Sequence, residues 1–292
     1  LLNNFKNTSR VLGVTPESIG KIAIKRGIPT ILNYFNKNTV KKILKKYGKA
    51  RIITATNVFA HIDNMQELIA NIKSCLSSDG IFISESHYFL KVIKEMQYDT
   101  VYHEHLRYYS IISLNYFLKK HGLQIFYVRE IDTHGGSIRV YASKNKKFKI
   151  HPNVLKMINK EKKFFKNRSL NNFQNKVLKT KMNLINIINK LKTKKKKIYG
   201  IGAPSRASTL INYIGIDEKM IDCILETTGS HKVDNFIPGT KIPIIDEDLI
   251  KKWPDYLLIF SWHIKDELKN IFKKKGFNGK FIIPLPTPKI ES

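Results

Sequence analysis

The segment RIITATNVFAHIDNMQELIANIKSCLSSDGIFISES (51–86) decides the fold class. Its two ends, RIITAT (51–56) and GIFISES (80–86), are short apolar runs rich in isoleucine, which is typical of buried strands. Between them, apolar residues at positions 65, 68, 69, 72 and 76 follow the period of a helix, which we expect to end at Gly80. Two strands separated by a helix indicate parallel neighbours in an α/β sheet.

The same alternation continues on both sides of this segment. Toward the N-terminus, RVLGV (10–14) is predicted to be a strand and PESIGKIAIKRG (16–27) a helix. The elements expected toward the C-terminus are a helix near 113–121 and two strands, LQIFYVREI (123–131) and SIRVYAS (137–143). We therefore predict a doubly wound, mostly parallel sheet over residues 1–150 that closes on an antiparallel pair.

A connector and a second alternating region follow. Residues 151–196 are rich in Lys and Asn with weak apolar periodicity, which predicts a helical connector. Residues 197–292 then alternate again, so we predict a second, smaller Rossmann-like α/β domain. Its expected strands are KKIYGIG (196–202), MIDCILE (220–226), IPII (242–245), YLLIFSW (256–262) and GKFIIP (279–284). Its expected helices are PSRASTLINYIG (204–215), DEDLIKKW (246–253) and KDELKNIFKKKG (265–276).

The charge and cysteine content limit the function classes. The net charge is +29, yet only eight of the 52 basic residues are Arg, which indicates a solvated lysine surface and no nucleic-acid partner. No run of 18 uncharged apolar residues occurs, so we expect no membrane partner. Two distant cysteines exclude a cysteine-rich zinc module within these residues, and a reducing, cytoplasmic location is expected. The sequence leaves the oligomeric state open.

A polar stretch, YDTVYHEHLRYY (98–109), crowds four tyrosines and two histidines into twelve positions. His103 and His105 have the spacing of metal ligands, whereas histidines beside tyrosines also suit acid/base chemistry, and a polar corner without chemistry is a third interpretation. Tyr102 and His105 are three residues apart, so one turn would place both on the same side. This spacing favours a single proton-handling cluster over a metal site, and we predict no metal.

A glycine turn in IYGIGAPSRAS (198–208) lies between a predicted strand and a predicted helix. Such a turn, here with Gly200 and Gly202, can face a phosphate, Arg206 would add a cation, and Glu226 could bind a ribose hydroxyl. The third glycine of the dinucleotide fingerprint is absent, and a tight turn without a ligand is the alternative.

Polar side chains also follow two other strands. Asn57 and His61 come after RIITAT, and Glu85 lies at the same place on the next strand, where ligands of open α/β sheets collect. A strand-end Asn satisfied within the protein is the alternative for Asn57. The segment THGGSIRVY (133–141) supplies three donors for an anionic or hydroxyl-rich ligand, or else a hairpin turn with a solvated Arg: His134, Ser137 and Arg139.

Five motifs occur in order along the chain: YDTVYHEHLRYYS (98–110), HGGSIRVY (134–141), YGIGAPSRASTLIN (199–212), FIPGTKIPI (236–244) and GKFIIPLP (279–286). Together they resemble the S-adenosylmethionine-dependent sugar C-methyltransferases, which methylate 4-keto-deoxysugar nucleotides, typically at C3, in deoxysugar biosynthesis. The resemblance extends from about Arg10 to Pro288 and implies a methyltransferase domain followed by a Rossmann-like domain that helps to hold a nucleotide-diphosphate sugar.

The resemblance also implies roles for individual residues. His105 looks like the general base, with Tyr102, His103 and Glu104 beside it, and Asn57 lies where the family has an Asn near S-adenosylmethionine, with His61 just beyond. The substrate would contact Glu85, His134, Ser137, Arg139, Gly202 and Arg206. Such a site would remove the proton next to the ketone to give an enolate, which attacks the sulfonium methyl.

Two features depart from the family pattern. A cysteine-ligated zinc module and a glycine-rich cofactor loop normally precede a segment like LLNNFKNTSRVLGV, so we expect the methyltransferase domain, 1–150, to be incomplete at its start. Zinc would then belong only to a module absent from this chain. Thr15 stands where the family has an acidic residue for the cofactor ribose. An NAD(P)-dependent oxidoreductase and a non-catalytic sugar-nucleotide-binding fragment are the alternative functions.

Overall fold

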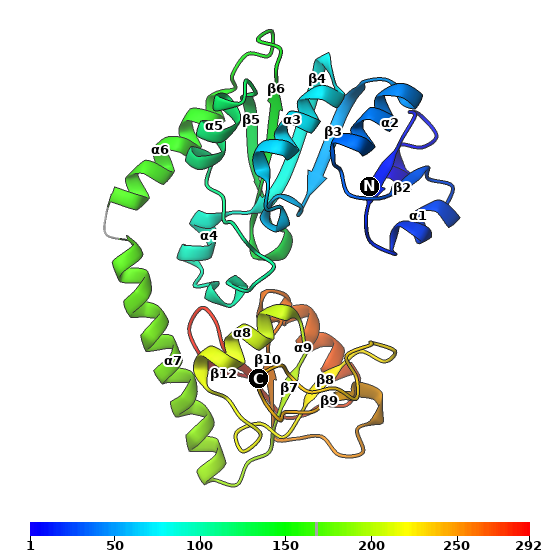
Figure 1. Ribbon diagram of the computed structural model, residues 1–292. Helices are drawn as coiled ribbons and strands as arrows, with labels where there is room; N and C mark the ends of the chain where they lie inside the picture. Colours follow the sequence, from blue (N-terminus) through cyan, green and yellow to red (C-terminus); the bar gives the residue numbers. More distant parts are fainter. Residues whose placement is uncertain (167–168) are drawn as a thin grey trace. The chain divides into compact units, whose positions relative to one another are not determined.

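The computed structural model describes residues 1–166 and 169–292, which fold into two compact units (Figure 1). The first unit consists of residues 1–86, 111–129 and 139–157, and the second of residues 87–110, 130–138 and 158–292. The polar stretch around His105 therefore folds with the second unit. The domain limits expected from the sequence stay predictions: 1–150, 151–196 and 197–292.

The first unit is built on a four-stranded sheet in the order β3-β4-β6-β5. The strands are β3 (Ala50–Thr56), β4 (Leu76–His87), β5 (Gln124–Ile131) and β6 (Ser137–Ser143). Strands β3 and β4 are parallel and are joined through helix α3 (Met65–Cys75), as predicted. The Asn64 side chain caps α3 by accepting from the Glu67 N–H at 3.0 Å. The helix ends at Cys75, before the expected Gly80, because β4 begins at the next residue.

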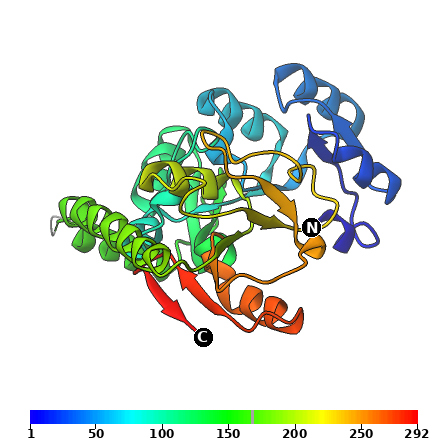
Figure 2. The same ribbon diagram turned by 90° about the horizontal axis from the view of Figure 1, so that it is seen from below.

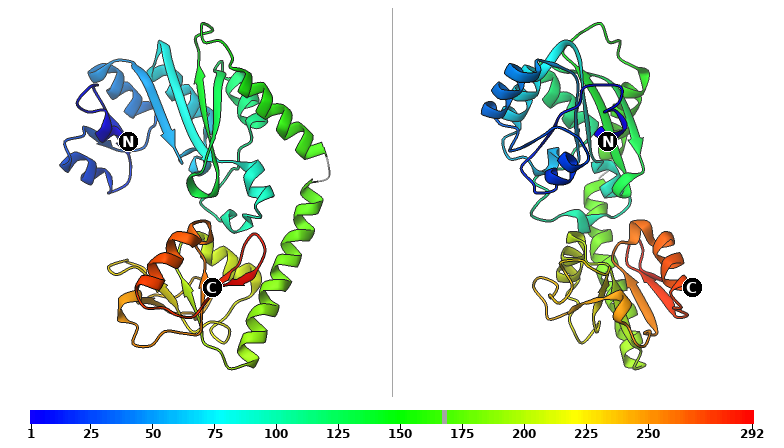
Figure 3. Two further views of the ribbon diagram at one scale, coloured as in Figure 1. Left: turned by 180° about the vertical axis from the view of Figure 1, so that it is seen from behind. Right: turned by 90° about the vertical axis from the view of Figure 1, so that its right-hand side faces the viewer.

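A second, smaller sheet lies near the N-terminus of this unit (Figure 3). It pairs β1 (Gly13–Thr15) with β2 (Thr30–Leu32) in parallel, apart from the four-stranded sheet. Val40 and Ile43 of helix α2 (Lys37–Tyr47) pack with Cys75 against apolar residues of β1, β2 and β3. Helix α1 (Gly20–Lys25) is shorter than the predicted helix, and helix α5 (Ile111–Lys120) precedes β5.

The second unit contains a six-stranded sheet in the order β12-β11-β10-β7-β8-β9. The strands are β7 (Ile198–Ile201), β8 (Ile224–Glu226), β9 (Ile244–Asp246), β10 (Tyr256–Ile259), β11 (Lys280–Ile283) and β12 (Lys289–Glu291). Strands β7 to β11 are parallel, whereas β12 pairs antiparallel with β11 at the sheet edge and was not predicted (Figure 2). The order reverses between β7 and β10, so their carboxyl ends form a topological switch point.

Helices and a large apolar core complete the second unit. The helices are α4 (Phe89–Lys94), α7 (Ser169–Thr193), α8 (Ser205–Ile214) and α9 (Lys265–Lys274). Helix α6 (Pro152–Lys166) is divided: its residues up to Met157 belong to the first unit and those from Ile158 onward to the second. The helix expected at 246–253 is wrong, since only a 3₁₀ turn forms at Glu247–Leu249. There the Asp246 carboxylate accepts the Asp248 N–H and the Thr228 hydroxyl, which competes with helical pairing.

The polar stretch is anchored in this core. A 3₁₀ turn, η3 (Tyr98–Thr100), follows α4, and Met96 and Tyr98 belong to the same apolar cluster as α7, α8 and the strands. The other 3₁₀ turns are η1 (Leu2–Asn4), η2 (Phe59–His61), η4 (Thr133–Gly135) and η6 (Trp262–Ile264). The predicted α/β class is confirmed, while the separate β1-β2 sheet of the first unit was not predicted. Across the described residues, none of the helices combines the length and the apolar character needed to span a bilayer.

Candidate functional site

His105 is held at both ring nitrogens. Its Nδ1 lies 3.0 Å from the Thr100 carbonyl oxygen, and its Nε2 lies 3.0 Å from the Tyr102 hydroxyl. A carbonyl oxygen only accepts hydrogen bonds, so Nδ1 is the donor in that contact, and in the tautomer with its proton on Nδ1 the Nε2 atom accepts from the Tyr102 hydroxyl. The Tyr108 hydroxyl donates to the same carbonyl at 2.6 Å. The predicted proximity of Tyr102 and His105 is confirmed, and their catalytic roles stay predictions.

A buried ion pair lies next to this carbonyl in the chain. The Asp99 carboxylate is fully buried and accepts from Arg206 Nε and Nη2, both at 2.8 Å. Trp262 Nε1 donates to the same carboxylate at 2.8 Å, and the guanidinium lies over the Trp262 ring at 5.2 Å. Arg206 Nη1 lies 3.2 Å from His263 Nδ1. Arg206 is thus 7% exposed and engaged on both edges, and its predicted contact with a diphosphate stays a prediction.

Two further histidines lie beside His105. The His87 ring is 5.2 Å from the His105 ring and 6.0 Å from the His134 ring, centroid to centroid, both edge-on. Burial, followed by the smaller effects of the neighbouring His105, Arg206 and His134, lowers the pKa of His87 to about 4. His87 is therefore neutral near pH 7. His134 adopts a left-handed backbone with φ of 55°, which is uncommon outside glycine and typical of constrained sites.

The tyrosines of the cluster are protonated at neutral pH. Burial raises the pKa of Tyr108 and Tyr109 to about 12, and burial also raises the pKa of Tyr102. Each phenol is therefore a hydrogen-bond donor under working conditions. Because the Tyr102 hydroxyl reaches His105 Nε2, it can donate to that nitrogen or to an oxygen bound beside it.

The other two members of the H-E-H motif do not join this network. His103 and Glu104 are exposed in the turn, and the His103 ring is 6.3 Å from the Tyr102 ring. Their predicted catalytic roles stay predictions. In the part of the chain that the structure describes, no group of three His, Cys, Asp or Glu side chains is arranged to hold a metal ion.

The predicted cofactor residues lie in the first unit. Thr15 ends β1, and its hydroxyl accepts the Glu17 N–H at 3.2 Å. Asn57 follows β3 with a left-handed φ of 54°, and its N–H donates to the Glu85 carbonyl at 2.8 Å. His61 is exposed at the end of η2. Thr15 and Asn57 supply neutral hydrogen-bonding groups near strand ends, and none of the three residues supplies a carboxylate.

Three predicted substrate residues also have partners within the protein. Arg139 donates to Glu85 Oε2 from Nε at 2.9 Å and from Nη2 at 2.7 Å, which satisfies much of both charged groups. The Ser137 hydroxyl donates to the Thr133 carbonyl at 3.1 Å and is fully buried. These contacts give the three side chains structural roles in the sheet and turn, and their substrate contacts stay predictions.

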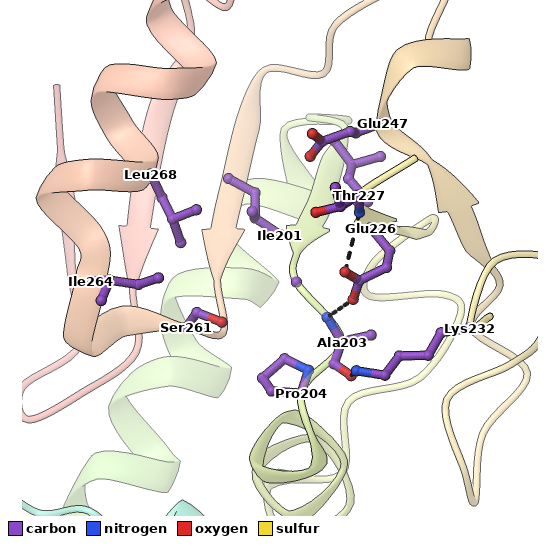
Figure 4. A pocket seen from close by; sticks show the side chains of 12 residues that line it. Ile201, Ala203, Pro204, Glu226, Thr227, Lys232, Glu247, Ser261, Ile264 and Leu268 are labelled. Atoms are coloured by element: carbon purple, nitrogen blue, oxygen red, sulfur yellow. Dashed lines mark hydrogen bonds between the residues drawn. The ribbon is translucent and has the colours of Figure 1, made fainter. Parts of the chain in front are cut away.

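A cavity of about 230 Å³ lies at the switch point of the six-stranded sheet (Figure 4). Its lining includes Gly202, with a φ of 77°, and Glu226 at the end of β8. The Glu226 carboxylate accepts the Ala203 N–H at 2.8 Å and the Thr227 N–H at 3.1 Å, while Lys232 donates to the Ala203 carbonyl at 2.9 Å. A carboxylate thus occupies the glycine turn where a phosphate would need free N–H groups.

Several functional candidates were missed from the sequence: His87, Asp99, Thr100, Tyr108, Trp262 and His263. His87 carried a weak signal, because it follows Glu85 at the end of a predicted strand. Asp99 and Tyr108 lay within the quoted polar stretch without a reason to single them out. The pairing of Asp99 with Arg206 and Trp262 spans 107 and 163 positions, and no spacing rule for a single sequence reaches that far.

Solved structures similar to this chain are distant. An S-adenosylmethionine-dependent methyltransferase from Clostridium acetobutylicum is 13% identical, with a TM-score of 0.38, over 50% of this chain and 79% of that chain. LepI in complex with SAM is 12% identical, with a TM-score of 0.37, over 48% of this chain and 38% of that chain. Likenesses of this size carry no argument about the site.

The sequence comparisons are more specific. A family model described as a methyltransferase domain matches residues 6–128, and a model described as the C-methyltransferase C-terminal domain matches residues 132–286. The C-methyltransferase NovU from Streptomyces niveus is 31% identical over 291 residues, which cover 97% of this chain and 69% of that protein. Both models and this relative are described as methyltransferases, and the two models match successive parts of the chain. The chain belongs to the S-adenosylmethionine-dependent C-methyltransferases.

Proposed function

We propose that this chain transfers a methyl group from S-adenosylmethionine to the carbon next to the keto group of a 4-keto-deoxysugar nucleotide. C-methyl transfer follows from the family, whereas the sugar nucleotide rests on the five ordered motifs. The observation that carries the mechanism is the ring of His105, whose Nδ1 faces the Thr100 carbonyl and whose Nε2 faces the Tyr102 hydroxyl.

His105 acts as the base in this proposal. A ketone at C4 acidifies the proton on C3, and Nε2 of the neutral imidazole takes that proton while the C–H electron pair becomes the enolate. The Thr100 carbonyl then accepts from the Nδ1–H of the imidazolium, which stabilises the charge the ring acquires. The neighbouring His87, with a pKa of about 4, does not compete for the proton at neutral pH.

Neutral donors stabilise the enolate oxygen. The Tyr102 hydroxyl remains protonated at pH 7 because burial raises its pKa, and the neutral His87 ring carries one N–H. Donors of this kind act where negative charge develops and need no reorganisation during the step, which is why they are effective in a partly buried site. Both side chains lie within the same cluster as His105 in the second unit.

The cofactor residues fit S-adenosylmethionine as neutral hydrogen-bond partners. Asn57 has a left-handed backbone just after β3, and Thr15 is the last residue of β1. Both side chains can therefore bind polar atoms of the adenosyl group in this proposal. When bound, the cofactor supplies an electrophilic methyl on a sulfonium. The chemistry it would supply is methyl transfer to the enolate carbon, in which the C–C bond would form as the C–S bond breaks. Thr15 gives the ribose a weaker acceptor than a carboxylate would.

The switch-point cavity does not favour the alternative oxidoreductase. An NAD(P) pyrophosphate needs the N–H groups of the glycine turn, and the Glu226 carboxylate already accepts the Ala203 N–H. A diphosphate placed there would also lie against a negative charge. We therefore assign the cavity no nicotinamide cofactor and retain C-methyl transfer as the proposed function.

Proton exchange in deuterated water tests the base. We expect the full-length protein to wash the C3 proton of a thymidine-diphospho-4-keto-6-deoxysugar into the solvent, and His105→Asn to abolish this exchange. Asn keeps a polar side chain of similar reach and cannot act as a base near pH 7. Binding of the nucleotide sugar, measured by calorimetry, should persist because the ring is not its main contact in the proposal.

His121→Asn is the matched control, because it makes the same change at the end of α5, outside the cluster. Its exchange rate should equal that of the wild type. Unchanged exchange in His105→Asn would reject His105 as the base. An absence of binding for both S-adenosylhomocysteine and the nucleotide sugar would reject the proposed substrates as well.

A further inference from the structure

We define the Asp99 clamp as Asp99, Arg206 and Trp262. Asp99 precedes Thr100, whose carbonyl contacts the proposed base, His105. Asp99 accepts three hydrogen bonds at 2.8 Å and is shielded from solvent on all sides. Arg206 projects from the first turn of α8, and Trp262 comes from η6 after β10. Helix α8 and turn η6 of the second unit therefore fix one side chain of η3.

The next residue passes this constraint to the base. The Thr100 carbonyl is the shared acceptor of His105 Nδ1–H, at 3.0 Å, and of the Tyr108 hydroxyl, at 2.6 Å. Thr100 is itself 1% exposed, and its hydroxyl donates to the Gln97 carbonyl at 2.8 Å. Because Asp99 and Thr100 are adjacent, a shift of the Asp99 side chain rotates the backbone that carries this carbonyl.

The carbonyl decides which nitrogen of His105 can act as the base. With the carbonyl in place, the proton stays on Nδ1 and Nε2 faces Tyr102. Without it, the free imidazole populates both tautomers, and the fraction with a protonated Nε2 cannot accept a proton there. The tautomer is thus under the control of residues that do not touch the ring.

We propose that Arg206 is a positioning residue, which clamps Asp99 so that the Thr100 carbonyl holds His105 with its proton on Nδ1 and Nε2 ready as the base. The expected effect of this role on kcat rests on the proposed function, whereas its effect on the His105 tautomer does not. The bidentate geometry matters, because the planar guanidinium satisfies both carboxylate oxygens at once and a lysine ammonium cannot.

The direct test measures the tautomer in the absence of substrate. The full chain, labelled with ¹⁵N in histidine, gives a long-range ¹H–¹⁵N spectrum in which the two ring nitrogens of each tautomer differ, and the His105 signals are those lost in His105→Asn. We expect a single Nδ1–H pattern in the wild type and a mixture in Arg206→Lys. The same single pattern in Arg206→Lys would overturn the proposal.

Kinetics separate positioning from substrate contact. A positioning role predicts that Arg206→Lys lowers kcat for methyl transfer about 10- to 100-fold, while KM for the nucleotide sugar changes less than about threefold. An increase in KM with an unchanged kcat would overturn the proposal, because it indicates a lost substrate contact. A wild type without methyl transfer would reject the proposed function, and the tautomer spectrum would still decide the role of Arg206.

Two further variants guard against simple destabilisation. Trp262→Phe removes one donor to Asp99 and leaves the ion pair, so it should shift the tautomer ratio in the same direction by less; it decides the test if Arg206→Lys does not fold. Ile282→Ala removes a fully buried side chain from β11, outside the clamp, and should lower stability while leaving the His105 tautomer unchanged. A mixed tautomer in Ile282→Ala would also overturn the proposal.

Discussion

A double-mutant cycle on Asp99 and Arg206 tests how strongly the two side chains depend on each other. The Asp99 side chain is fully buried and the Arg206 side chain is 8% exposed, so either group alone would be a buried charge without its partner. Breaking such a pair from one side costs about 3–5 kcal/mol. We therefore expect both Asp99→Asn and Arg206→Met to lower the free energy of unfolding by about that amount.

The double variant should lose much less than the sum. It contains no buried charge, Trp262 can still donate to the amide oxygen of Asp99→Asn, and the cost left is one unpaired amide group, about 1–3 kcal/mol. The coupling energy, which is the summed loss of the two single variants minus the loss of the double variant, is then at least about 3 kcal/mol in favour of the pair.

Urea unfolding followed by tryptophan fluorescence is a suitable assay. The protein has two tryptophans, Trp253 and Trp262, and both belong to the second unit, so the signal reports the unit that contains the clamp. Because Trp262 donates to Asp99, the substitutions can change its fluorescence directly, so unfolding should also be followed by circular dichroism at 222 nm. If the effects of the single changes add within about 0.5 kcal/mol, the two groups are independent and the argument for a clamp fails.

Two predictions concern pH. Burial lowers the pKa of His87 and of His263 to about 4, and unfolded histidines bind protons near 6.5, so the free energy of unfolding should fall as the pH drops from 6.5 toward 4. Urea titrations across this range should show a shallower fall in His87→Asn, and an equally steep one contradicts the origin in His87. Hydrogen bonds from Lys265 and Lys289 lower the pKa of Glu291 to about 2, so its contribution is complete above about pH 4.5 and disappears as the pH falls through 2. Because Glu291 is partly exposed, Glu291→Gln should cost less than about 1 kcal/mol at pH 7 and speed amide exchange in β12; unchanged exchange would contradict this.

Local sequence patterns were sufficient for most elements. The apolar period of α3 predicted a buried face, and Leu68, Ile69 and Ile72 are buried as expected. Helix α8 begins after Pro204 and ends at Ile214, and the next residue, Gly215, adopts the left-handed conformation that caps it. These features depend on neighbours a few residues apart, and such neighbours are visible in a sequence.

Features set by distant partners were not predictable. The edge strand β12 forms because residues 289–291 pair with β11, and KIE has no strand signal of its own. The pattern at 246–253 suggested a helix, but hydrogen bonds from Thr228 to Asp246 and Asp248 lock the chain in another conformation. In the site, the short spacing of Tyr102 and His105 predicted their contact, whereas the clamp joins residues more than a hundred positions apart.

The composition of the polar stretch explains why it needs a clamp. Tyr98, Asp99, Thr100 and Tyr109 are buried, whereas residues 101–108 between them are exposed or half-buried, so apolar packing cannot fix the segment that carries His105. A base must nevertheless be held within about half an ångström of its productive position. The order has to come from hydrogen bonds, and two of them, from His105 Nδ1 and the Tyr108 hydroxyl, converge on one acceptor, the Thr100 carbonyl. That acceptor is rigid because its neighbour is tied to α8 and η6, so these two elements of the second unit supply the stiffness that the polar stretch lacks.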